Sequence, residues 1–228
     1  MKVMFIADEE SKAMWDYYDP RRTEGVELII SCGDLKPSYL EFLETMVNCP
    51  LLYVKGNHDR QYAQRPPLGC VCIDDRVYDY KGLRILGLGG SMRYNPDTDC
   101  QFSEEEMQAR IRKVNRQIVL MNGFDLLVTH APAKGYGDMD DLPHRGFDCF
   151  NTLMEKWKPK YMVHGHVHQT YSYKFERERQ HSSGTKIINA YESYILDIGS
   201  DEHPAKGKTG SPFYDLMVAM KGRGKHNY

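Results

Sequence analysis

An α/β fold is predicted by three features of this sequence of 228 residues. First, short apolar runs of strand length alternate with longer segments that have helical spacing. Second, each of the early apolar runs continues into a loop that is rich in Asp, Gly, Asn or His. Third, two Ser residues are followed three positions later by Glu, which is the capping-box pattern of a helix start. We therefore expect buried strands that deliver polar loops.

The N-terminal part of the chain predicts strands that are connected by helical crossovers. Three apolar runs are the expected strands: residues 3–7, 28–32 and 51–54. Between the last two, Ser38 and Glu41 have capping-box spacing and begin a helix that we expect to end near Val47. Strands that are joined through a helix can pair in parallel, so parallel pairing is expected here.

The middle of the chain adds a hairpin and an amphipathic helix. Residues 77–80 and 83–88 are predicted to be two strands joined by a tight turn at residues 81–82, which makes a mixed sheet the expectation. Ser103 and Glu106 form the second capping-box pair. The helix that follows presents four apolar residues on one face: Met107, Ile111, Val114 and Ile118.

One more helix and the remaining strands complete the predicted domain. The apolar side of this helix consists of Phe147, Phe150, Met154 and Trp157. The remaining strands are expected at residues 126–129, 161–164, 185–189 and 194–198. An alternating segment at 170–175 precedes the last two. We predict one domain over residues 1–200 and a solvated Gly/Lys-rich tail over residues 201–228, whose apolar island at 213–220 docks on the domain or on a partner.

The composition excludes several broad classes of protein. With 41% hydrophobic and 27% charged residues, the chain is typical of a globular protein, and no apolar stretch is long enough to cross a bilayer. The apolar start at residues 1–7 is too short for a signal peptide, and six dispersed cysteines are expected to be reduced thiols, so a cytoplasmic location is expected. The formal net charge of −2 predicts no general attraction to nucleic acid or to membranes.

Five loops at the expected strand ends carry the side chains of chemical interest. These loops contain Asp8-Glu9-Glu10, Gly33-Asp34, Gly56-Asn57-His58-Asp59, Thr129-His130 and Gly165-His166-Val167-His168. Open α/β sheets bind ligands at the carboxyl ends of their strands, where such loops converge. Gly33, Gly56 and Gly165 are expected to let the backbone turn sharply there. Carboxylate, amide and imidazole groups suit Mn, Fe or Zn, and six or seven ligands fit two ions about 3.5 to 4 Å apart.

Each of these features has a structural explanation when it is taken alone. An Asp after Gly is most often a turn residue, and a single His is most often a satisfied loop or core residue. Asn57-His58-Asp59 could be a plain polar loop, and the Gly-His-Val-His string alone gives weak support for a metal. The coincidence of five such loops at strand ends favours a metal site over these explanations.

The motifs resemble, in the same order, those of the calcineurin-like metallophosphoesterases. The resemblance spans residues 8–168 and depends on Gly33-Asp34, Gly56-Asn57-His58-Asp59, Thr129-His130 and Gly165-His166-Val167-His168. Further features similar to small bacterial members are Gly89-Gly90-Ser91, Ala131-Pro132 and His144-Arg145-Gly146-Phe147. The resemblance implies a four-layer α/β/β/α sandwich with two mixed β-sheets and a dinuclear metal site at the strand C-terminal ends. It also implies metal-dependent hydrolysis of a phosphodiester or a phosphomonoester.

The resemblance implies a role for each matched residue. The first ion is then held by Asp8, Asp34 and His168, and the second ion by Asp34, Asn57, His130 and His166. His58 is the imidazole beside the scissile phosphate, where it protonates the leaving oxygen or stabilises the developing charge. Asp59 is expected either to orient that ring or to face solvent. A hydroxide that bridges the two metals is the expected nucleophile.

Substrate contacts are expected from Asn57, Arg93 and His144. The planar guanidinium of Arg93 suits a phosphate, although a surface salt bridge is an equal alternative. His144 is placed in the loop after His130, where it either reaches the substrate or faces water. His164 shares the alternation of His166 and His168 but matches no ligand position, so it is expected to be a packing residue.

One position departs from the family pattern. Members usually have Asp-x-His at the first motif, whereas position 10 of this chain is Glu. Glu10 is either a metal ligand, which would favour Mn, Fe or Mg over Zn, or it points away and leaves the first site weak or empty. The expected cofactors are two divalent ions, with Mn or Fe first and Zn or Mg as alternatives.

Three functional hypotheses follow, and a phosphoesterase is the leading one because His58 serves chemistry more than folding. A catalytically weakened metal-binding scaffold protein is the alternative, since the first motif is changed at Glu10. The third is a nuclease that uses the basic residues near the C-terminus, but this run is short and lacks interleaved aromatic residues. The sequence alone does not determine the substrate or the oligomeric state.

Overall fold

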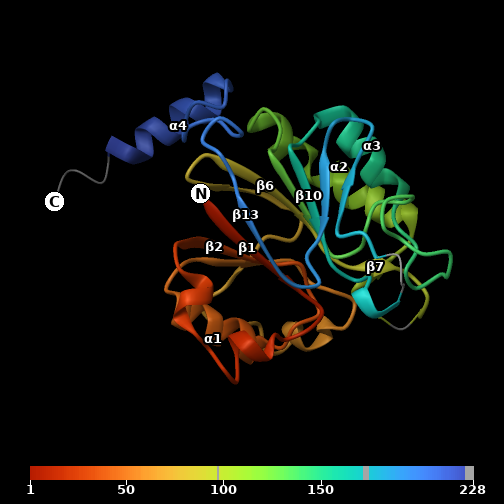
Figure 1. The fold of residues 1–228 in the computed structure, drawn as a ribbon. Coiled ribbons are helices and arrows are strands. Elements are labelled where there is room, and N and C mark those ends of the chain that lie inside the picture. The colour runs from red at the N-terminus through yellow and green to blue at the C-terminus, as the bar shows by residue number, and fades with distance from the viewer. Residues whose placement is uncertain (97, 172–174, 224–228) are drawn as a thin grey trace.

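The computed structural model describes residues 1–228 apart from residues 97, 172–174 and 224–228. Two β-sheets face each other, and helices cover the outer side of each sheet (Figure 1). α1 (Pro37–Val47) packs on the first sheet, whereas α2 (Glu104–Leu120) and α3 (Asp148–Trp157) pack on the second. This is the α/β/β/α layering that the resemblance implied, so the predicted fold class is confirmed.

The first sheet contains five strands in the order β13-β1-β2-β3-β4. Their bounds are Glu192–Asp197 for β13, Lys2–Ala7 for β1, Val26–Ser31 for β2, Leu51–Tyr53 for β3 and Val71–Cys72 for β4. β1, β2 and β3 pair in parallel, as expected, and β13 runs antiparallel along β1. β4 also pairs in parallel with β3, so the sheet is mixed, and the carboxyl ends of its four parallel strands lie at one edge.

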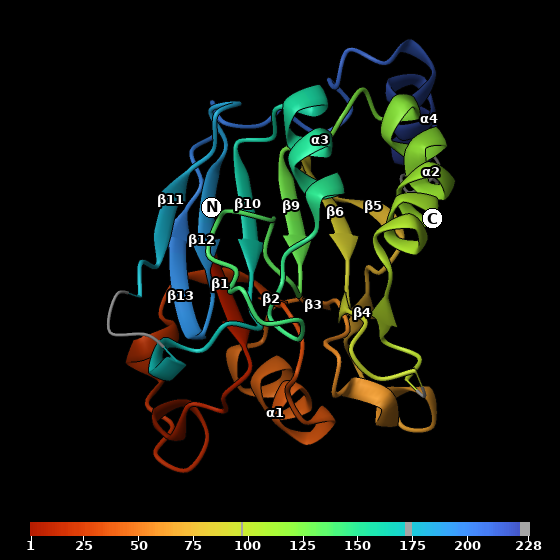
Figure 2. The same cartoon turned by 90° about the vertical axis from the view of Figure 1, so that its right-hand side faces the viewer.

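The second sheet contains six strands in the order β11-β12-β10-β9-β6-β5. Their bounds are Glu178–Gln180 for β11, Lys186–Asn189 for β12, Tyr161–His164 for β10, Leu126–Thr129 for β9, Leu83–Leu88 for β6 and Arg76–Tyr80 for β5. β5 and β6 form the expected antiparallel hairpin, and β6, β9, β10 and β12 are parallel (Figure 2). This sheet is also mixed, as predicted.

The alternating segment at 170–175 overlaps residues 172–174, which lie outside the described residues. Residues before this gap form a short 3-10 helix, Gln169–Tyr171. A two-stranded sheet of β7 (Ser91–Met92) and β8 (Gln101–Phe102) was not expected, because each strand is too short to produce a periodic pattern. Three further 3-10 helices are Lys12–Met14, Pro20–Thr23 and Asp59–Ala63.

The two capping-box predictions have different outcomes. At α2 the Ser103 hydroxyl accepts from the Glu106 amide at 3.3 Å, and the Glu106 carboxylate accepts from the Ser103 amide at 2.7 Å, which confirms the prediction. At α1 the prediction is wrong, because the helix begins one residue before Ser38, at Pro37. Proline fixes φ at a helical value and has no amide hydrogen to satisfy, so it is well suited to the first helical position.

The apolar residues form three clusters that match the layers. The central cluster lies between the sheets and joins Phe5 and Ile30 of the first sheet to Ile85 and Val163 of the second. The other clusters lie beneath α1 and beneath the α2–α3 pair. The four-layer arrangement therefore buries both faces of the central strands of each sheet, and the polar loops remain at the strand ends.

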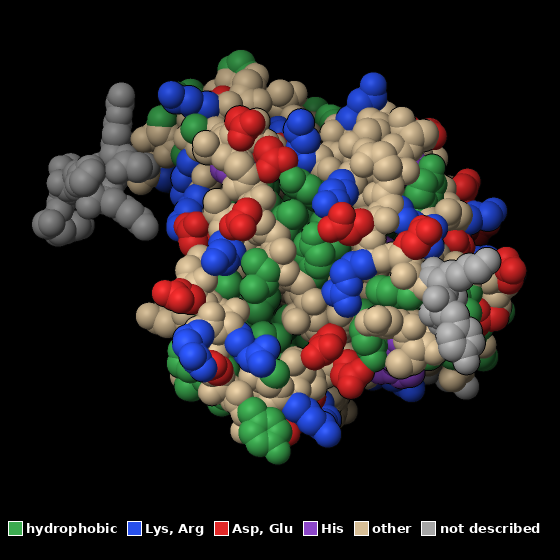
Figure 3. All heavy atoms as spheres, in the orientation of Figure 1, with side chains coloured by type: hydrophobic (Ala, Val, Ile, Leu, Met, Phe, Trp, Pro, Cys, Tyr) green, Lys and Arg blue, Asp and Glu red, His purple; other side chains and the backbone are tan. Residues whose placement is uncertain are grey.

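The chain after β13 leads to a fourth helix, α4 (Pro212–Arg223), at the opposite end of the molecule from the functional loops (Figure 2). Its Tyr214 is buried and packs with Met217 and Val218 against the α2–α3 side of the core. On the face drawn in Figure 3, acidic and basic side chains are interspersed. Among the described helices, none combines the length and the apolarity that a membrane span requires.

Candidate metal centre

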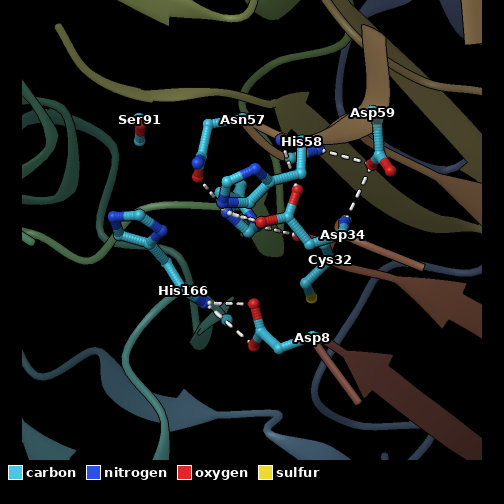
Figure 4. A network of polar contacts seen from close by, with 12 residues as sticks. Asp8, Cys32, Asp34, Asn57, His58, Asp59, Ser91 and His166 are labelled. Carbon is cyan, nitrogen blue, oxygen red and sulfur yellow. Dashed lines mark hydrogen bonds and ion pairs between the residues drawn. The ribbon is translucent and has the colours of Figure 1, made fainter. Parts of the chain in front are cut away.

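The loops after β1, β2, β3, β9 and β10 converge at one edge of the two sheets. Figure 4 shows Asp8, Asp34, Asn57, His58 and His166 directed toward a common space. The five loops come from both sheets, because the carboxyl ends of β1, β2 and β3 meet those of β9 and β10. The predicted convergence is therefore present in the structure.

Three of the predicted ligands have a left-handed backbone conformation. The φ angles are 66° at Asp8, 59° at Asp34 and 71° at His166. This region costs a residue other than glycine roughly 1 to 3 kcal/mol, and such strain clusters at functional sites. The backbone is therefore locally strained at the three positions whose side chains point into the site.

Three glycines allow the ligand loops to touch. A Cβ atom on Gly33 would lie 2.3 Å from the Gly56 amide nitrogen, and one on Gly56 would lie 2.0 Å from the Asp34 carboxylate. A Cβ atom on Gly165 would lie 2.7 Å from an oxygen of Asp8. Each glycine is therefore required by the close approach of two ligand loops, as the sequence suggested.

Asp34, Asn57, His130 and His166 supply the second predicted metal site. Nε2 of His130 lies 2.9 Å from Oδ1 of Asn57 and 3.3 Å from Oδ2 of Asp34. One ligand atom each from Asp34, His130 and His166 lie within 4.8 Å of one another. A carboxylate, an amide oxygen and two imidazoles are a donor set for a borderline or hard divalent ion, so these residues fit a metal.

Backbone carbonyls determine which nitrogen of each histidine faces this cluster. Nδ1 of His130 lies 2.8 Å from the Cys32 carbonyl, and Nε2 of His166 lies 2.7 Å from the Pro143 carbonyl. Each carbonyl must accept a hydrogen from the ring nitrogen that contacts it, which directs the other nitrogen of the ring toward the cluster. Metal-ligating histidines in proteins are held in this way.

In the metal-free protein, a protonated His130 forms a buried ion pair with the Asp34 carboxylate, with Nε2 3.3 Å from Oδ2. Burial lowers the pKa of His130, but the Asp34 carboxylate raises it more, to about 9. Burial raises the pKa of Asp34, but the charge and hydrogen bond of His130 lower it to about 2. His166 is buried beside a cationic His130, so its pKa falls to about 3 and it stays neutral.

The first predicted metal site has fewer preorganised ligands. Both carboxylate oxygens of Asp8 accept a hydrogen bond from the His166 amide, each at 2.9 Å. Burial raises the pKa of Asp8 to about 7. Nε2 of His168 lies 3.9 Å from Oδ1 of Asp8. The Glu10 carboxylate lies 3.4 Å from the Lys36 ammonium, while Glu9 hydrogen-bonds the Tyr191 hydroxyl. Glu10 thus has a cationic partner at the rim of the site.

Asp59 has a role that differs from both sequence alternatives. Its Oδ2 accepts hydrogen bonds from the amides of Asp34 and Gly56, each at 2.8 Å, and it is buried. The carboxylate therefore joins two ligand loops through their backbone, instead of orienting the His58 ring or facing solvent. His58 is exposed, and its amide donates to Oδ1 of Asp34 at 2.8 Å.

The structure brings one of the two peripheral substrate candidates to the site. The His144 ring lies 5.2 Å from the His166 ring and 4.9 Å from Tyr171, and Nδ1 of His144 lies 2.7 Å from the Asp141 carboxylate. The guanidinium of Arg93 instead lies 2.8 Å from Glu106 of α2. His164 is buried, with Nδ1 2.9 Å from the Gly165 carbonyl, in the position of a packing residue.

Two aromatic residues at the site were missed by the sequence analysis. The Tyr171 ring stacks on His168 with a centroid distance of 4.5 Å and an interplanar angle of 13°. The Tyr94 hydroxyl lies 3.2 Å from Nδ2 of Asn57. Tyr171 follows His168 by three residues, which is a weak signal, whereas no pattern in the sequence connects Tyr94 with Asn57.

A cleft of about 430 Å³ opens beside the ligands. Its lining includes Asp8, Glu10, Asp34, Lys36 and His58, so predicted ligands of both metals are accessible from one side. The combination of two facing mixed sheets, acidic and imidazole ligands at their carboxyl ends and an open cleft defines a metal-dependent hydrolase scaffold.

Comparison with known proteins identifies the family. The model of the calcineurin-like phosphoesterase superfamily domain matches residues 1–191, and the chain belongs to this superfamily, whose members are generally metal-dependent phosphoester hydrolases. An uncharacterized protein of Haemophilus influenzae is 26% identical, over 87% of this chain and 98% of its own length. A UPF0046 protein of Caenorhabditis elegans is 29% identical, over 86% and 81%. TT1561 of Thermus thermophilus shares the fold, with a TM-score of 0.57, 11% identity and coverage of 84% and 89%.

Proposed function

We propose that this protein hydrolyses a phosphodiester or a phosphomonoester with the help of two divalent metal ions, Mn or Fe in preference to Zn or Mg. The observation that carries the proposal is the convergence of Asp34, Asn57, His130 and His166, with one nitrogen of each imidazole held by a backbone carbonyl. Family membership supports the same chemistry. Because backbone carbonyls hold the outer nitrogen of each ring, the inner nitrogens of both imidazoles lie beside the Asp34 carboxylate, where they would be available to a metal ion.

We assign the ligands to the two ions as the resemblance implied. Asp34 would contribute to both sites. Asp8, His168 and Glu10 would complete the first site, and Asn57, His130 and His166 the second. When bound, the ions would activate water as the nucleophile and neutralise charge on the phosphate. If Glu10 turned from Lys36 toward the first site, the Lys36 ammonium would be available to the anionic substrate at the cleft rim.

His58 is the proposed catalytic residue. Its backbone is fixed on Asp34, and its side chain lines the open cleft beside the predicted ligands. From there the imidazole can donate a proton to the leaving oxygen, a contribution that is typically worth about 10²- to 10⁴-fold in rate. Asn57 and His144 remain the proposed substrate contacts, whereas Arg93 is paired with Glu106 away from the cleft. The carboxylate of Asp141 fixes the ring orientation of His144.

The test is hydrolysis of an aryl phosphodiester and an aryl phosphomonoester by the Mn-loaded protein. We expect turnover by the wild type, and a kcat for His58→Ala that is about 10²- to 10⁴-fold lower, with Mn²⁺ affinity unchanged. His203→Ala is the matched control, because its imidazole contacts the Pro204 carbonyl far along the chain from the site. Equal activity of wild type and His58→Ala would exclude His58 as the proton donor.

A metal-binding scaffold without turnover is the second candidate, and the Glu10–Lys36 pair favours it. The Glu10 carboxylate is already paired with the Lys36 ammonium, and breaking this pair would weaken its binding of an ion. Without Glu10 as a ligand, the first site would be incomplete. This candidate predicts a Mn stoichiometry near one, unchanged by Glu10→Gln, together with no hydrolysis of a broad substrate panel. A stoichiometry of two that falls to one in Glu10→Gln would support the dinuclear enzyme.

A further inference from the structure

Asn57 can ligate a metal ion only through its amide oxygen, so the orientation of the amide decides whether the second site is complete. Oδ1 lies on the side of the cluster, 2.9 Å from Nε2 of His130. Nδ2 lies on the other side and donates a hydrogen bond to the Tyr94 hydroxyl at 3.2 Å. The amide is therefore held from both of its ends.

The contact with His130 cannot persist when a metal binds. Nδ1 of His130 donates its hydrogen to the Cys32 carbonyl, so Nε2, which lies 2.9 Å from the amide oxygen, is the ring nitrogen that would bind the ion. A histidine nitrogen must lose its hydrogen before it can bind a metal ion. Among the described residues, Tyr94 is then the remaining hydrogen-bond partner of the Asn57 side chain. A flipped amide would direct two N–H donors at the cation.

Tyr94 is itself fixed by its neighbours. Its amide and that of the next residue donate to Oε1 of Gln101, at 3.1 and 3.0 Å, and Gln101 is buried. The preceding Arg93 is tied to Glu106 of α2, and β7 pairs with β8 on either side of the loop. The backbone that carries the Tyr94 side chain is therefore held in place by hydrogen bonds to Gln101.

We propose that Tyr94 is a positioning residue whose hydroxyl holds the Asn57 amide with its oxygen toward the second metal ion. The inference rests on the proposed function, since it concerns the affinity of the second site. It also gives Arg93 a defined task, because the Arg93–Glu106 ion pair anchors the loop that carries Tyr94.

The test is a calorimetric titration of the chelator-treated, full-length protein with Mn²⁺ alone. Tyr94→Phe removes one hydroxyl, and we expect about tenfold weaker binding at the affected site, as for other residues that orient ligands. Tyr80→Phe is the matched control, because it also loses a hydroxyl that donates to a protein carbonyl, that of Glu27, far from the cluster. Its Mn²⁺ affinity should stay within twofold of the wild type.

Tyr94→Phe in an Asn57→Asp background separates the effect of amide orientation on Mn²⁺ affinity from other effects of the substitution. A carboxylate presents an oxygen in either orientation, so Tyr94→Phe should then change Mn²⁺ affinity by less than twofold. An equal loss in both backgrounds, or no loss in the wild-type background, would overturn the inference while the wild type still binds Mn²⁺. Failure of the wild type to bind Mn²⁺ would overturn the proposed function and this inference together.

Discussion

At the scale of single residues, the metal-free site is organised by the ion pair of His130 and Asp34. The pair is buried, and the pKa of His130 is raised to about 9 while that of Asp34 is lowered to about 2, so both groups are charged at neutral pH. A metal ion that binds Nε2 of His130 must displace its proton. Metal binding at this site would therefore exchange a proton for a metal ion, and both equilibria would depend on pH.

The stability of the metal-free protein should fall as pH rises above neutral. His130 has a pKa near 6.5 when unfolded and about 9 when folded, so the folded state binds more protons between these values. The free energy of unfolding should decrease by up to about 1.4 kcal/mol per pH unit in that window. Urea unfolding with a chelator, at pH values from 7 to 9, measures this slope. His130→Gln is expected to flatten it, and a flat slope in the wild type would contradict the raised pKa.

Asp59 should be required for the geometry of the site as well as for stability. Asp59→Ala would leave the buried amides of Asp34 and Gly56 without their acceptor, at a cost of roughly 1 to 3 kcal/mol for each unsatisfied group. Because these amides belong to two ligand loops, Mn²⁺ affinity should fall as well. Urea unfolding and Mn²⁺ titration are the measurements, with Asp99→Ala, an exposed carboxylate, as the control. Unchanged Mn²⁺ affinity in Asp59→Ala would show that the two ligand loops keep their positions without the hydrogen bonds of Asp59.

At the scale of elements, the sequence predicted the strands that deliver ligands because each is a compact apolar run that ends in a polar loop. It also predicted α2, whose Ser103–Glu106 capping box forms as expected. It missed β4, β7 and β8, which have two residues each, and β11, which has three, because such short strands show no periodicity. The start of α1 was misplaced because Pro37 is a stronger start signal than Ser38 with Glu41.

The site residues that could be predicted from the sequence are those that directly follow a predicted strand. Asp8, Asp34, His130 and His166 lie close to strand ends, so sheet geometry alone brings them together. The partners that orient these ligands were not predictable. The Pro143 carbonyl and the Tyr94 hydroxyl come from irregular loops, whose path depends on tertiary contacts such as Arg93 with Glu106.

The junction between β10 and the site should be intolerant of any side chain at Gly165. Gly165→Ala would place Cβ 2.6 Å from the side chain of Ala7 and 2.7 Å from the Asp8 carboxylate. Such overpacking typically costs about 1 to 3 kcal/mol, and a displaced Asp8 should also weaken Mn²⁺ binding. Gly135→Ala is the comparison, because a Cβ there meets nothing within 4 Å and only its left-handed φ of 84° is penalised. Urea unfolding and Mn²⁺ titration of both variants would refute the steric argument if Gly135→Ala lost as much metal affinity as Gly165→Ala.

At the scale of the whole molecule, the described residues after position 200 are attached to the domain by hydrogen bonds and apolar contacts. Nδ2 of Asn122, after α2, donates to the Thr209 carbonyl at 2.9 Å. The Asp215 carboxylate accepts from the amides of Thr209 and Gly210, at 2.9 and 3.0 Å, and thereby closes the turn that leads into α4. The predicted domain boundary at residue 200 can be tested by asking whether α4 unfolds together with the sheets or before them.

Adjacent aromatic residues of α4 can answer this question. Tyr214 is 8% exposed and donates its hydroxyl hydrogen to Asp79 at 2.7 Å, whereas Phe213 is 69% exposed. If α4 is part of the cooperative core, Tyr214→Ala should lower the free energy of unfolding by roughly 3 kcal/mol, as for other large-to-small core changes. Phe213→Ala should change it by less than about 0.5 kcal/mol. Both are measured by urea unfolding of the full chain. Similar small effects would mean that residues 201–228 behave as the separate tail that the sequence predicted. A large effect of Tyr214→Ala alone would extend the cooperative unit into α4.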